Sequence, residues 1–534
     1  MSFLLDFCKQ FPSIICYGVS DHGFMVKHFL EAHGIYVSGF LVSDKREEDS
    51  LLDGVPVYAV QDVDSLPLDC GIVLSLFERH HATVLQNLKV NGSLHEVYPI
   101  SDAAQQKMHK ELLQITRKRV LAQTVDFSKT EKEQFETLFQ QLSKQYRIIE
   151  CRFMEAIRVG ALSLWRYYCY LRYRDKNNVF YLYYPVTQEH HPEEHLRGAN
   201  GYLLSKMQCR GIETLNESNL KFWQYVFQKH SDWFIMNDSY TFTEWTQNML
   251  NDYKHIPTDE NLLTFDDVER KDGNKRIKNL GIITDYVCIS NRDMMFLQTA
   301  KRERLIPDFR DSYRNSDIEN HGVAVDYLAT CNIQAVRMGA VVEKQWRHEN
   351  VINYAGSKYR SEFMDLYLVS QCKFFVGDLS GILAFAMLLA KPMIITNAPL
   401  LTNRYDAAVF CSPDRDIALL KKLWDTKNKR YLTIRDMLNF EINICTQEPN
   451  LTGAAFAEYR RREILPVDNT PEDILAVVKE MNERIDGTIQ YDALDLELQQ
   501  RYREIVDNYP MKDNILNNWR LGAAFLRENQ WLLE

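Results

Sequence analysis

Three strand-loop-helix units follow one another between Cys288 and Asn397, and this repetition limits the possible fold more than any other feature of the chain. The predicted strands are 285–290, 333–336 and 373–376, and each runs into polar or small residues. Short β-rich segments that alternate with helical apolar segments are typical of βαβ units and a parallel sheet. In such sheets ligands bind beyond the carboxyl ends of the strands. We therefore expect a binding site in the loops that follow these strands.

The residues in those loops are suited to binding an anion. Ser380-Gly381 precedes a predicted helix at 382–390, and a hydroxyl followed by glycine at a helix N-terminus leaves backbone N–H groups free to bind phosphate. Arg292 and Arg337 stand at the ends of neighbouring strands and can bind the same anion in a bidentate manner. The chain contains no G-x-x-x-x-G-K-[ST] sequence, so the site is not a P-loop. The alternative is that Ser380 only caps the helix and the arginines form surface ion pairs.

Several sequence blocks in this region together resemble a known family. They are 311–320, 336–339, 354–355 with 363–368, 380–381, and 391–392 with Asn397. Their order and spacing are similar to those of a bacterial family of GT-B glycosyltransferases found with surface-polysaccharide genes. The resemblance extends over residues 125–490. It implies a two-domain fold and a nucleotide-sugar donor, and it does not identify the acceptor. We expect a glycan or lipid-linked acceptor, and we expect no metal or other cofactor, because enzymes of this fold usually stabilise the departing diphosphate with arginines and a helix N-terminus.

The resemblance also assigns roles to individual residues. Met338 and Gly339 would let the backbone approach the nucleotide, and Arg314 with Asn315 would close over it. Asp378 stands where hydroxyl residues are expected, and an acid close to a diphosphate repels it unless the acid binds ribose or sugar hydroxyls. The predicted catalytic residues are Asp293, Arg292 and Arg158, and the predicted donor-binding residues are Arg314, Asn315, Arg337, Met338, Gly339, Asp378, Ser380 and Gly381.

Residues 1–100 have an α/β pattern of their own. A strand at 13–17 leads into Gly18 and Gly23, and a second strand at 37–42 ends near Asp44, which is a Rossmann-like order. The two glycines do not complete G-x-G-x-x-G, so the signal for dinucleotide binding is incomplete. The segment resembles the small N-terminal domain of bacterial sugar O-acyltransferases. Gly18, Gly23 and Asp44 would face a ligand if it binds one, and the alternative is a docking or structural module.

Length and composition restrict the classes of protein that the chain can belong to. At 534 residues several domains are expected, and a net charge of -10 argues against a protein that coats nucleic acid. The eleven cysteines form no C-x-x-C pair, which indicates free thiols in a reducing cytoplasm. The chain has no run of 18 apolar residues and its first residues lack the pattern of a signal peptide. We therefore expect a cytoplasmic protein that can associate with the inner face of the cytoplasmic membrane.

We thus predict an α/β protein, with a GT-B type pair of Rossmann-like domains preceded by a small Rossmann-like domain. Residues 253–282 are polar and turn-rich and are interpreted as a linker, and helices are predicted at 416–424, from Thr470 and at 514–533. The predicted parts are a Rossmann-like domain (1–100), a helical linker (101–146), an acceptor-side domain (147–275), a donor domain (276–490) and C-terminal helices (491–534).

Three functions remain open from the sequence. The first is a glycosyltransferase that acts in surface-polysaccharide assembly. The second is a non-catalytic assembly protein that binds nucleotides or glycans and keeps the fold. The third is an NAD-dependent enzyme that uses residues 1–100, which the missing third glycine disfavours.

Overall fold

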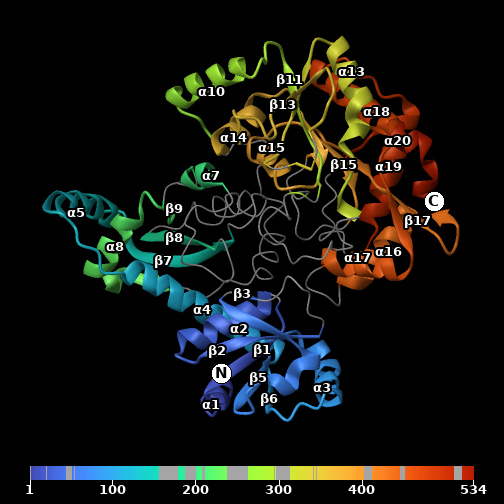
Figure 1. The fold of residues 1–534 in the computed structure, drawn as a ribbon. Coiled ribbons are helices and arrows are strands. Elements are labelled where there is room, and N and C mark those ends of the chain that lie inside the picture. Colours follow the sequence, from blue (N-terminus) through green and yellow to red (C-terminus); the bar gives the residue numbers. More distant parts are fainter. Residues whose placement is uncertain are drawn as a thin grey trace. The chain divides into compact units, whose positions relative to one another are not determined.

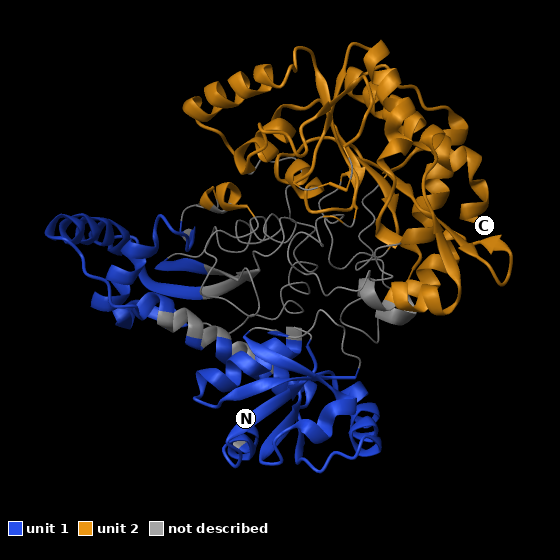
Figure 2. Cartoon of the chain, in the orientation of Figure 1, with its two compact units in different colours: residues 1–157, 176–198, 210–240 blue, residues 158–175, 199–209, 241–534 orange. Residues whose placement is uncertain are grey.

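The computed structural model places most of the chain in two compact units (Figure 2). Unit 1 comprises Met1–Ile157, Lys176–Gly198 and Arg210–Tyr240, and unit 2 comprises Arg158–Asp175, Ala199–Cys209 and Thr241–Glu534. Parallel sheets occur in both units, which confirms the α/β class. The predicted domain borders stay predictions. The described residues are 2–19, 21–43, 51–52, 54–155, 178–186, 200–206, 211–236, 263–293, 295, 313–340, 342–343, 345–401, 412–445, 451–509 and 520–534.

The first hundred residues of unit 1 fold around a six-stranded sheet (Figure 1). All its neighbouring strands are parallel except β3 and β4. Helix α2 (Asp21–Ala32), with α1 (Ser2–Cys8), packs on one face, and α3 (His81–Val90) packs on the other, so the sheet is covered on both sides. In spatial order the strands are β3 (Leu51–Leu52), β4 (Val55–Ala59), β2 (Val37–Val42), β1 (Ser13–Tyr17), β5 (Cys70–Leu74) and β6 (Val97–Pro99).

The two predicted glycines of this segment lie in the turn after β1 (Gly18) and in the first turn of α2 (Gly23). Gly18 has a φ of +116°, and a Cβ at Gly23 would lie 2.0 Å from the carbonyl oxygen of Gly18. Glycine at position 23 therefore lets α2 approach the end of β1 closely, as in a Rossmann-type turn. Asp44 lies outside the described residues.

The rest of unit 1 forms a smaller sheet in which all four strands are parallel. Its core surrounds Trp223 of α8 (Leu220–Lys229). Two helices, α4 (Asp102–Ala122) and α5 (Lys129–Ser143), occupy the segment between the two sheets, and α4 contributes Met108 to the first core and Leu121 to the second. In spatial order the strands are β10 (Phe234–Met236), β7 (Tyr146–Glu155), β8 (Asn178–Val186) and β9 (Ile212–Thr214).

Unit 2 is built on a seven-stranded sheet in which every neighbouring pair is parallel (Figure 1). Strand β11 comes first in the chain, β12 and β13 are added on one side, and β14, β15 and β16 on the other. The strand order therefore reverses between β11 and β14, and doubly wound sheets bind ligands at this point. In spatial order the strands are β13 (Val351–Asn353), β12 (Gln334–Arg337), β11 (Tyr286–Ser290), β14 (Phe375–Asp378), β15 (Met393–Ala398), β16 (Ile417–Leu420) and β20 (Arg520–Leu521).

Helices and a small antiparallel sheet surround this core. The antiparallel sheet has the order β18 (Arg430–Tyr431), β17 (Lys422–Asp425) and β19 (Ile464–Val467). The helices are α7 (Gly201–Ser205), α10 (Asp267–Asn279), α13 (Gly322–Thr330), α14 (Glu362–Gln371), α15 (Leu383–Leu388), α16 (Ile434–Cys445), α17 (Leu451–Arg461), α18 (Pro471–Asp486), α19 (Ala493–Asp507) and α20 (Ala523–Glu528).

Three predictions of local structure in unit 2 are wrong. The helix predicted at 416–424 is two strands, β16 and β17, because periodicity alone does not separate a short buried strand from a buried helix. The predicted linker contains helix α10, which buries only Gly273 and therefore has no apolar stripe to reveal it. In the segment predicted as a helix at 514–533, β20 adds the seventh strand before α20 begins. The predicted helix start at Thr470 is confirmed, with Thr470 and Asp473 forming a capping box.

A glycine in β14 determines how closely β11 and β14 approach. A Cβ at Gly377 would lie 2.8 Å from the main-chain oxygen of Ser290 and 2.5 Å from its Oγ. We expect Gly377→Ala to push the two strands apart and to lower stability by about 1–3 kcal/mol, the usual cost of overpacking. Gly322→Ala is the matched control, because the nearest atom to its Cβ would be 3.7 Å away and its φ is -55°. A thermal melt in which both variants behave alike would contradict this account.

Candidate functional site

The polar loops predicted from the sequence meet where the strand order of the seven-stranded sheet reverses. Asn291, Arg292 and Asp293 follow β11 directly, and Asp378 is the last residue of β14. Both strands are fully buried, so only their ends can present polar groups. The loop that contains Arg314, Asn315 and Ser316 also reaches this edge, where Ser316 Oγ donates to Asp378 and Arg314 donates to the Leu379 carbonyl oxygen. We call this place the β11/β14 edge.

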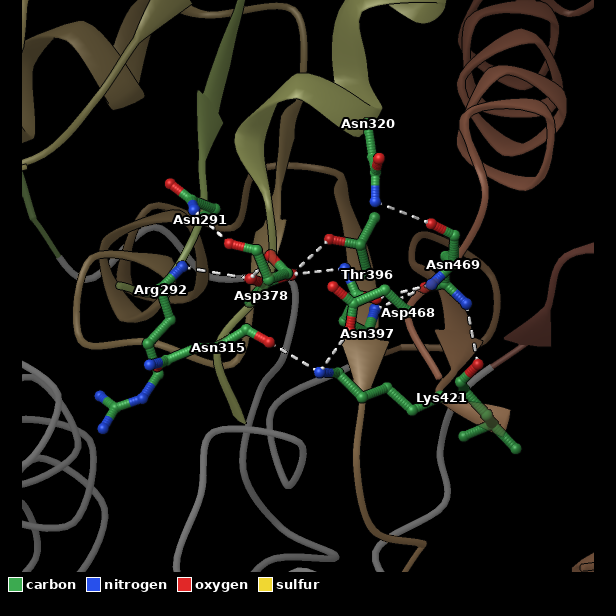
Figure 3. Close-up of polar contacts among 12 residues, drawn as sticks. Asn291, Arg292, Asn315, Asn320, Asp378, Thr396, Asn397, Lys421, Asp468 and Asn469 are labelled. Atoms are coloured by element: carbon green, nitrogen blue, oxygen red, sulfur yellow. Dashed lines mark hydrogen bonds and ion pairs between the residues drawn. The ribbon is translucent and has the colours of Figure 1, made fainter. Parts of the chain in front are cut away.

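Asp378 connects four segments of the chain at this edge (Figure 3). Its side chain is only 1% exposed and accepts hydrogen bonds from the Arg292 N–H (3.1 Å), Thr396 Oγ1 (2.8 Å), Asn397 Nδ2 (3.1 Å) and Ser316 Oγ. A buried carboxylate is stable only when such donors replace its lost hydration. Asp378 therefore fixes the loop after β11, the last residues of β15 and the loop around Ser316 relative to one another.

Arg337, the last residue of β12, supplies a buried positive charge next to Asp378. Its guanidinium donates to Asn291 Oδ1 and to the Met338 carbonyl oxygen (3.2 Å). Burial lowers the pKa of Arg337 to about 10, and Asp293 and Asp378 partly offset that effect. The group therefore remains charged at neutral pH, and Asn291 in turn donates to the Ser316 carbonyl oxygen (2.7 Å).

A second set of contacts lies beside the first (Figure 3). Lys421, whose side chain is 0% exposed, donates to the Asn315 carbonyl oxygen (2.7 Å) and forms an ion pair with Asp468 (2.7 Å). Asn397 and Asn469 exchange two bonds, each donating its backbone N–H to the other's side-chain oxygen (2.6 and 2.8 Å). Because Asn397 also donates to Asp378, the two sets form one network.

Several buried polar atoms at this edge have no hydrogen-bond partner among the described residues. They are Ser290 Oγ, Asn315 Oδ1, His321 Nε2, Arg337 Nε and Ser380 Oγ. Native proteins pair the great majority of such atoms, and each exception needs an explanation. Donors and acceptors that are buried, held in place and unpaired are what a polar ligand requires for recognition.

Most of the predicted site residues lie at the β11/β14 edge. Arg314 donates to the Leu379 carbonyl oxygen (3.2 Å), and Gly339 has a φ of +150°, which glycine adopts without strain. Each carboxylate oxygen of Asp293 accepts one backbone N–H, from Met295 and from Glu343, both at 3.1 Å. Arg158 lies outside the described residues, and Gly18 and Gly23 lie in unit 1, after β1 and in α2. The catalytic and donor-binding roles stay predictions.

Sequence reasoning missed several members of the network. Lys421 is the clearest case, since it stands with Lys422 between the apolar segments 417–420 and 423–424, and a lysine next to such segments is a signal for a buried, paired charge. Asn469 pairs with Asn397 across 72 residues of sequence, and the residues around either position do not indicate that contact. His321, Ser316 and Thr396 are also absent from the site residues that the sequence predicts. Their roles depend on the position of Asp378.

His321 adds an ionisable group that is fully buried at this edge. Burial lowers its pKa below the ordinary 6.5, with the charge of Arg337 acting in the same direction and Asp378 in the opposite one. As pH falls below 6.5, the unfolded chain binds a proton at this histidine that the folded chain does not, so folding stability falls.

We therefore expect His321→Gln to remove part of the loss of stability that the wild type shows between about pH 7.5 and 5.5. Linkage limits this effect to about 1.4 kcal/mol per pH unit. Trp346→Phe is the control, because Trp346 contacts the His321 ring and does not titrate in this range. Equal pH dependence of the melting temperature in wild type and His321→Gln would contradict the assignment.

Comparison with known proteins finds similarity at the level of structure. No known family and no curated protein matches the chain in sequence. It is similar to a glycosyltransferase family 9 structure from Veillonella parvula DSM 2008, at 10% identity over 89% of this chain and 97% of that one, with a TM-score of 0.26. E. coli ADP-heptose LPS heptosyltransferase II is 9% identical over 77% of this chain and 90% of that one, with a TM-score of 0.23. Methanocaldococcus jannaschii UDP-GlcNAc 2-epimerase, solved with UDP-GlcNAc and UDP, is 10% identical over 84% of this chain and 99% of that one, with a TM-score of 0.19.

Glycosyltransferases are thus among the structural neighbours of this chain. None of the helices in the described part of the chain has the length and apolar character needed to cross a bilayer.

Proposed function

We propose that the chain is a glycosyltransferase that transfers a sugar from a nucleotide-sugar to a glycan or lipid-linked acceptor. In this proposal the diphosphate of the donor binds at the β11/β14 edge. The observation that carries it is the convergence of buried, unpaired polar atoms at the strand-order reversal of a doubly wound sheet. Its place in bacterial surface-polysaccharide assembly, at the inner face of the cytoplasmic membrane, is part of the same proposal.

The chemistry requires charge to be stabilised on the leaving group. As the acceptor hydroxyl attacks the anomeric carbon and gives its proton to a base, the bond from that carbon to the diphosphate oxygen breaks, and the nucleoside diphosphate leaves with the electron pair of that bond and added negative charge. Preorganised donors and cations lower the barrier of such a step. We propose that Arg292, Arg314 and Arg337 supply this charge together with Ser380 and Gly381, and that no metal ion is needed. The side chain of Arg292 extends away from Asp378 (Figure 3).

An acid at position 378 is expected to repel the diphosphate, and the burial of Asp378 weakens that repulsion. Because four donors surround its carboxylate, its negative charge is largely compensated inside the protein. We propose that Asp378 organises the donor-binding loops and does not touch the diphosphate. Asp293 holds two backbone N–H groups and is proposed as a positioning residue that also stabilises the charge of Arg337.

A thermal-shift panel of UDP, GDP, CMP, dTDP and NAD tests the proposal. A ligand at about 100 times its dissociation constant stabilises the folded state by about 2.7 kcal/mol, which is readily seen. We expect one nucleotide to raise the melting temperature of the wild type and to raise that of Arg292→Ala much less. Arg462→Ala, which changes an arginine packed over Phe440 in the same unit, should respond like the wild type. A response to NAD alone would favour an enzyme that uses residues 1–100, and no response would favour a non-catalytic assembly protein.

A further inference from the structure

At the β11/β14 edge, the backbone of Asn315 is hydrogen-bonded, whereas its side-chain oxygen is not. Its main-chain carbonyl oxygen accepts a 2.7 Å hydrogen bond from Lys421. Its side-chain oxygen Oδ1 is buried and has no hydrogen-bond partner among the described residues. The backbone of this residue is therefore fixed, while its side chain presents an unpaired acceptor.

Lys421, which donates to Asn315, is itself fixed by burial and by contacts with two other segments of the chain. Its side chain is 0% exposed, and besides Asn315 it contacts Asp468, whose side chain is 33% exposed. The backbone N–H of Lys421 donates to the Ala398 carbonyl oxygen at the end of β15 (2.9 Å). The next residue after Asp468, Asn469, pairs with Asn397 through two hydrogen bonds. Lys421 thus holds the Asn315 loop close to the ends of β15 and β19 (Figure 3).

Chemistry limits what Asn315 Oδ1 can bind. A carboxamide oxygen accepts hydrogen bonds and repels phosphate oxygens, so its partner on a ligand must be an O–H or N–H group. Next to Asn315, Arg314 donates to the Leu379 carbonyl oxygen, which places Asn315 beside the Ser380-Gly381 turn where the diphosphate is proposed to bind. In a nucleotide-sugar, the groups next to the diphosphate are the ribose and the transferred sugar, and both carry hydroxyls.

We infer that Asn315 is a specificity-determining residue whose Oδ1 accepts a hydrogen bond from a hydroxyl of the nucleotide-sugar, and that Lys421 is the positioning residue that holds it there. This inference rests on the proposed function. A polar site built to bind a hydroxyl rejects the analogue that lacks it, because the buried acceptor is then left unpaired. The chain would accordingly discriminate between donors by their hydroxyl groups and not by charge alone.

The experiment measures dissociation constants of UDP, ADP and GDP, their 2′-deoxy forms, and UDP-glucose, ADP-glucose and GDP-mannose by calorimetry on the full chain. Asn315→Leu removes the acceptor with little change of volume, and Lys421→Met removes the positioning contact. We expect each variant to weaken binding of the preferred donor by about three- to tenfold, the range for one hydrogen bond. The double variant should bind no more weakly than the weaker single variant, because both changes remove the same contact.

Lys373→Met is the matched control. Lys373 also joins an amide oxygen and a carboxylate, those of Asn482 (2.7 Å) and Asp486 (2.8 Å), but it lies at the start of β14, at the opposite edge of the sheet. This variant should lose stability and keep the wild-type affinities. If Asn315→Leu weakens nucleoside diphosphates and nucleotide-sugars equally, the hydroxyl is on the ribose, and if it weakens only the nucleotide-sugars, the hydroxyl is on the sugar.

The possible failures are distinguishable. A wild type that binds none of these probes overturns the proposed function, and the inference with it. A wild type that binds a probe while Asn315→Leu binds it equally well overturns the inference and leaves the proposed function standing. Equal losses in Lys421→Met and Lys373→Met would show a general loss of stability and would overturn the positioning role of Lys421.

Discussion

Asp378→Asn is expected to lower the stability of unit 2 by about 3 kcal/mol, because leaving a buried donor unpaired costs about 1–3 kcal/mol and the amide can satisfy only part of the four donors. The asparagine keeps one accepting oxygen and turns an N–H₂ group toward hydrogen-bond donors such as Thr396 and Asn397. With the amide turned the other way, its N–H₂ group would instead face the backbone N–H of Arg292, and the loop after β11 would lose that contact. We therefore also expect nucleotide affinity to fall by about tenfold or more.

A control for this variant exists in the same sheet. Asp416 is as buried as Asp378, at 1% exposure, and accepts backbone N–H bonds from Met393 (3.0 Å) and Ser412 (2.8 Å). It precedes β16 and so lies at the opposite edge of the sheet. Asp416→Asn should cost comparable stability in a thermal melt and leave calorimetric nucleotide affinity unchanged. Loss of affinity in both variants would show that affinity follows stability, and it would contradict a specific role for Asp378.

Arg337→Met is expected to have the second large effect. It removes a buried charge, leaves Asn291 Oδ1 without its donor, and takes away the cation that faces Asp293 and Asp378. Breaking a buried charge network of this kind costs about 3–5 kcal/mol. Nucleotide affinity should fall by about 10- to 100-fold, which corresponds to the loss of one hydrogen bond to a charged group.

The matched control replaces another buried arginine. Arg415 donates to both carboxylate oxygens of Asp416 (3.0 and 2.8 Å) at the opposite edge of the sheet, and its side chain is 13% exposed. Arg415→Met should destabilise the chain and preserve binding, which thermal melts and calorimetry measure on the same samples. If Arg337→Met keeps wild-type affinity at a temperature where it is folded, Arg337 does not act on the nucleotide.

Local sequence patterns predicted the parts of unit 2 that position the site. The strands that became β11, β12 and β14 combine β-rich residues with polar ends, and Arg292, Arg337 and Ser380 stand at those ends. The carboxyl ends of parallel strands meet at one edge, so strand assignment was enough to bring these residues together. This worked because the information lies within a few residues of each strand.

The rest of the network depends on contacts that are distant in the sequence. The sequence predicts that Asp378 binds the donor, and the structure buries it among hydrogen-bond donors from residues 292, 316, 396 and 397. The predicted helix at 416–424 contains Lys421, because a short apolar segment does not show whether its period is that of a strand or a helix. Only the sheet register brings it to Asn315 and Asp468.

Hydrogen–deuterium exchange locates a bound nucleotide on the chain and so tests whether it binds at the β11/β14 edge of unit 2. Exchange is compared on the full chain with and without the nucleotide that gives the largest thermal shift. We expect slower exchange in peptides covering 286–293, 313–322 and 378–383, with exchange in peptides covering 13–23 unchanged. Slower exchange at 13–23 with none at the β11/β14 edge would place the nucleotide in the first sheet of unit 1 and contradict the account.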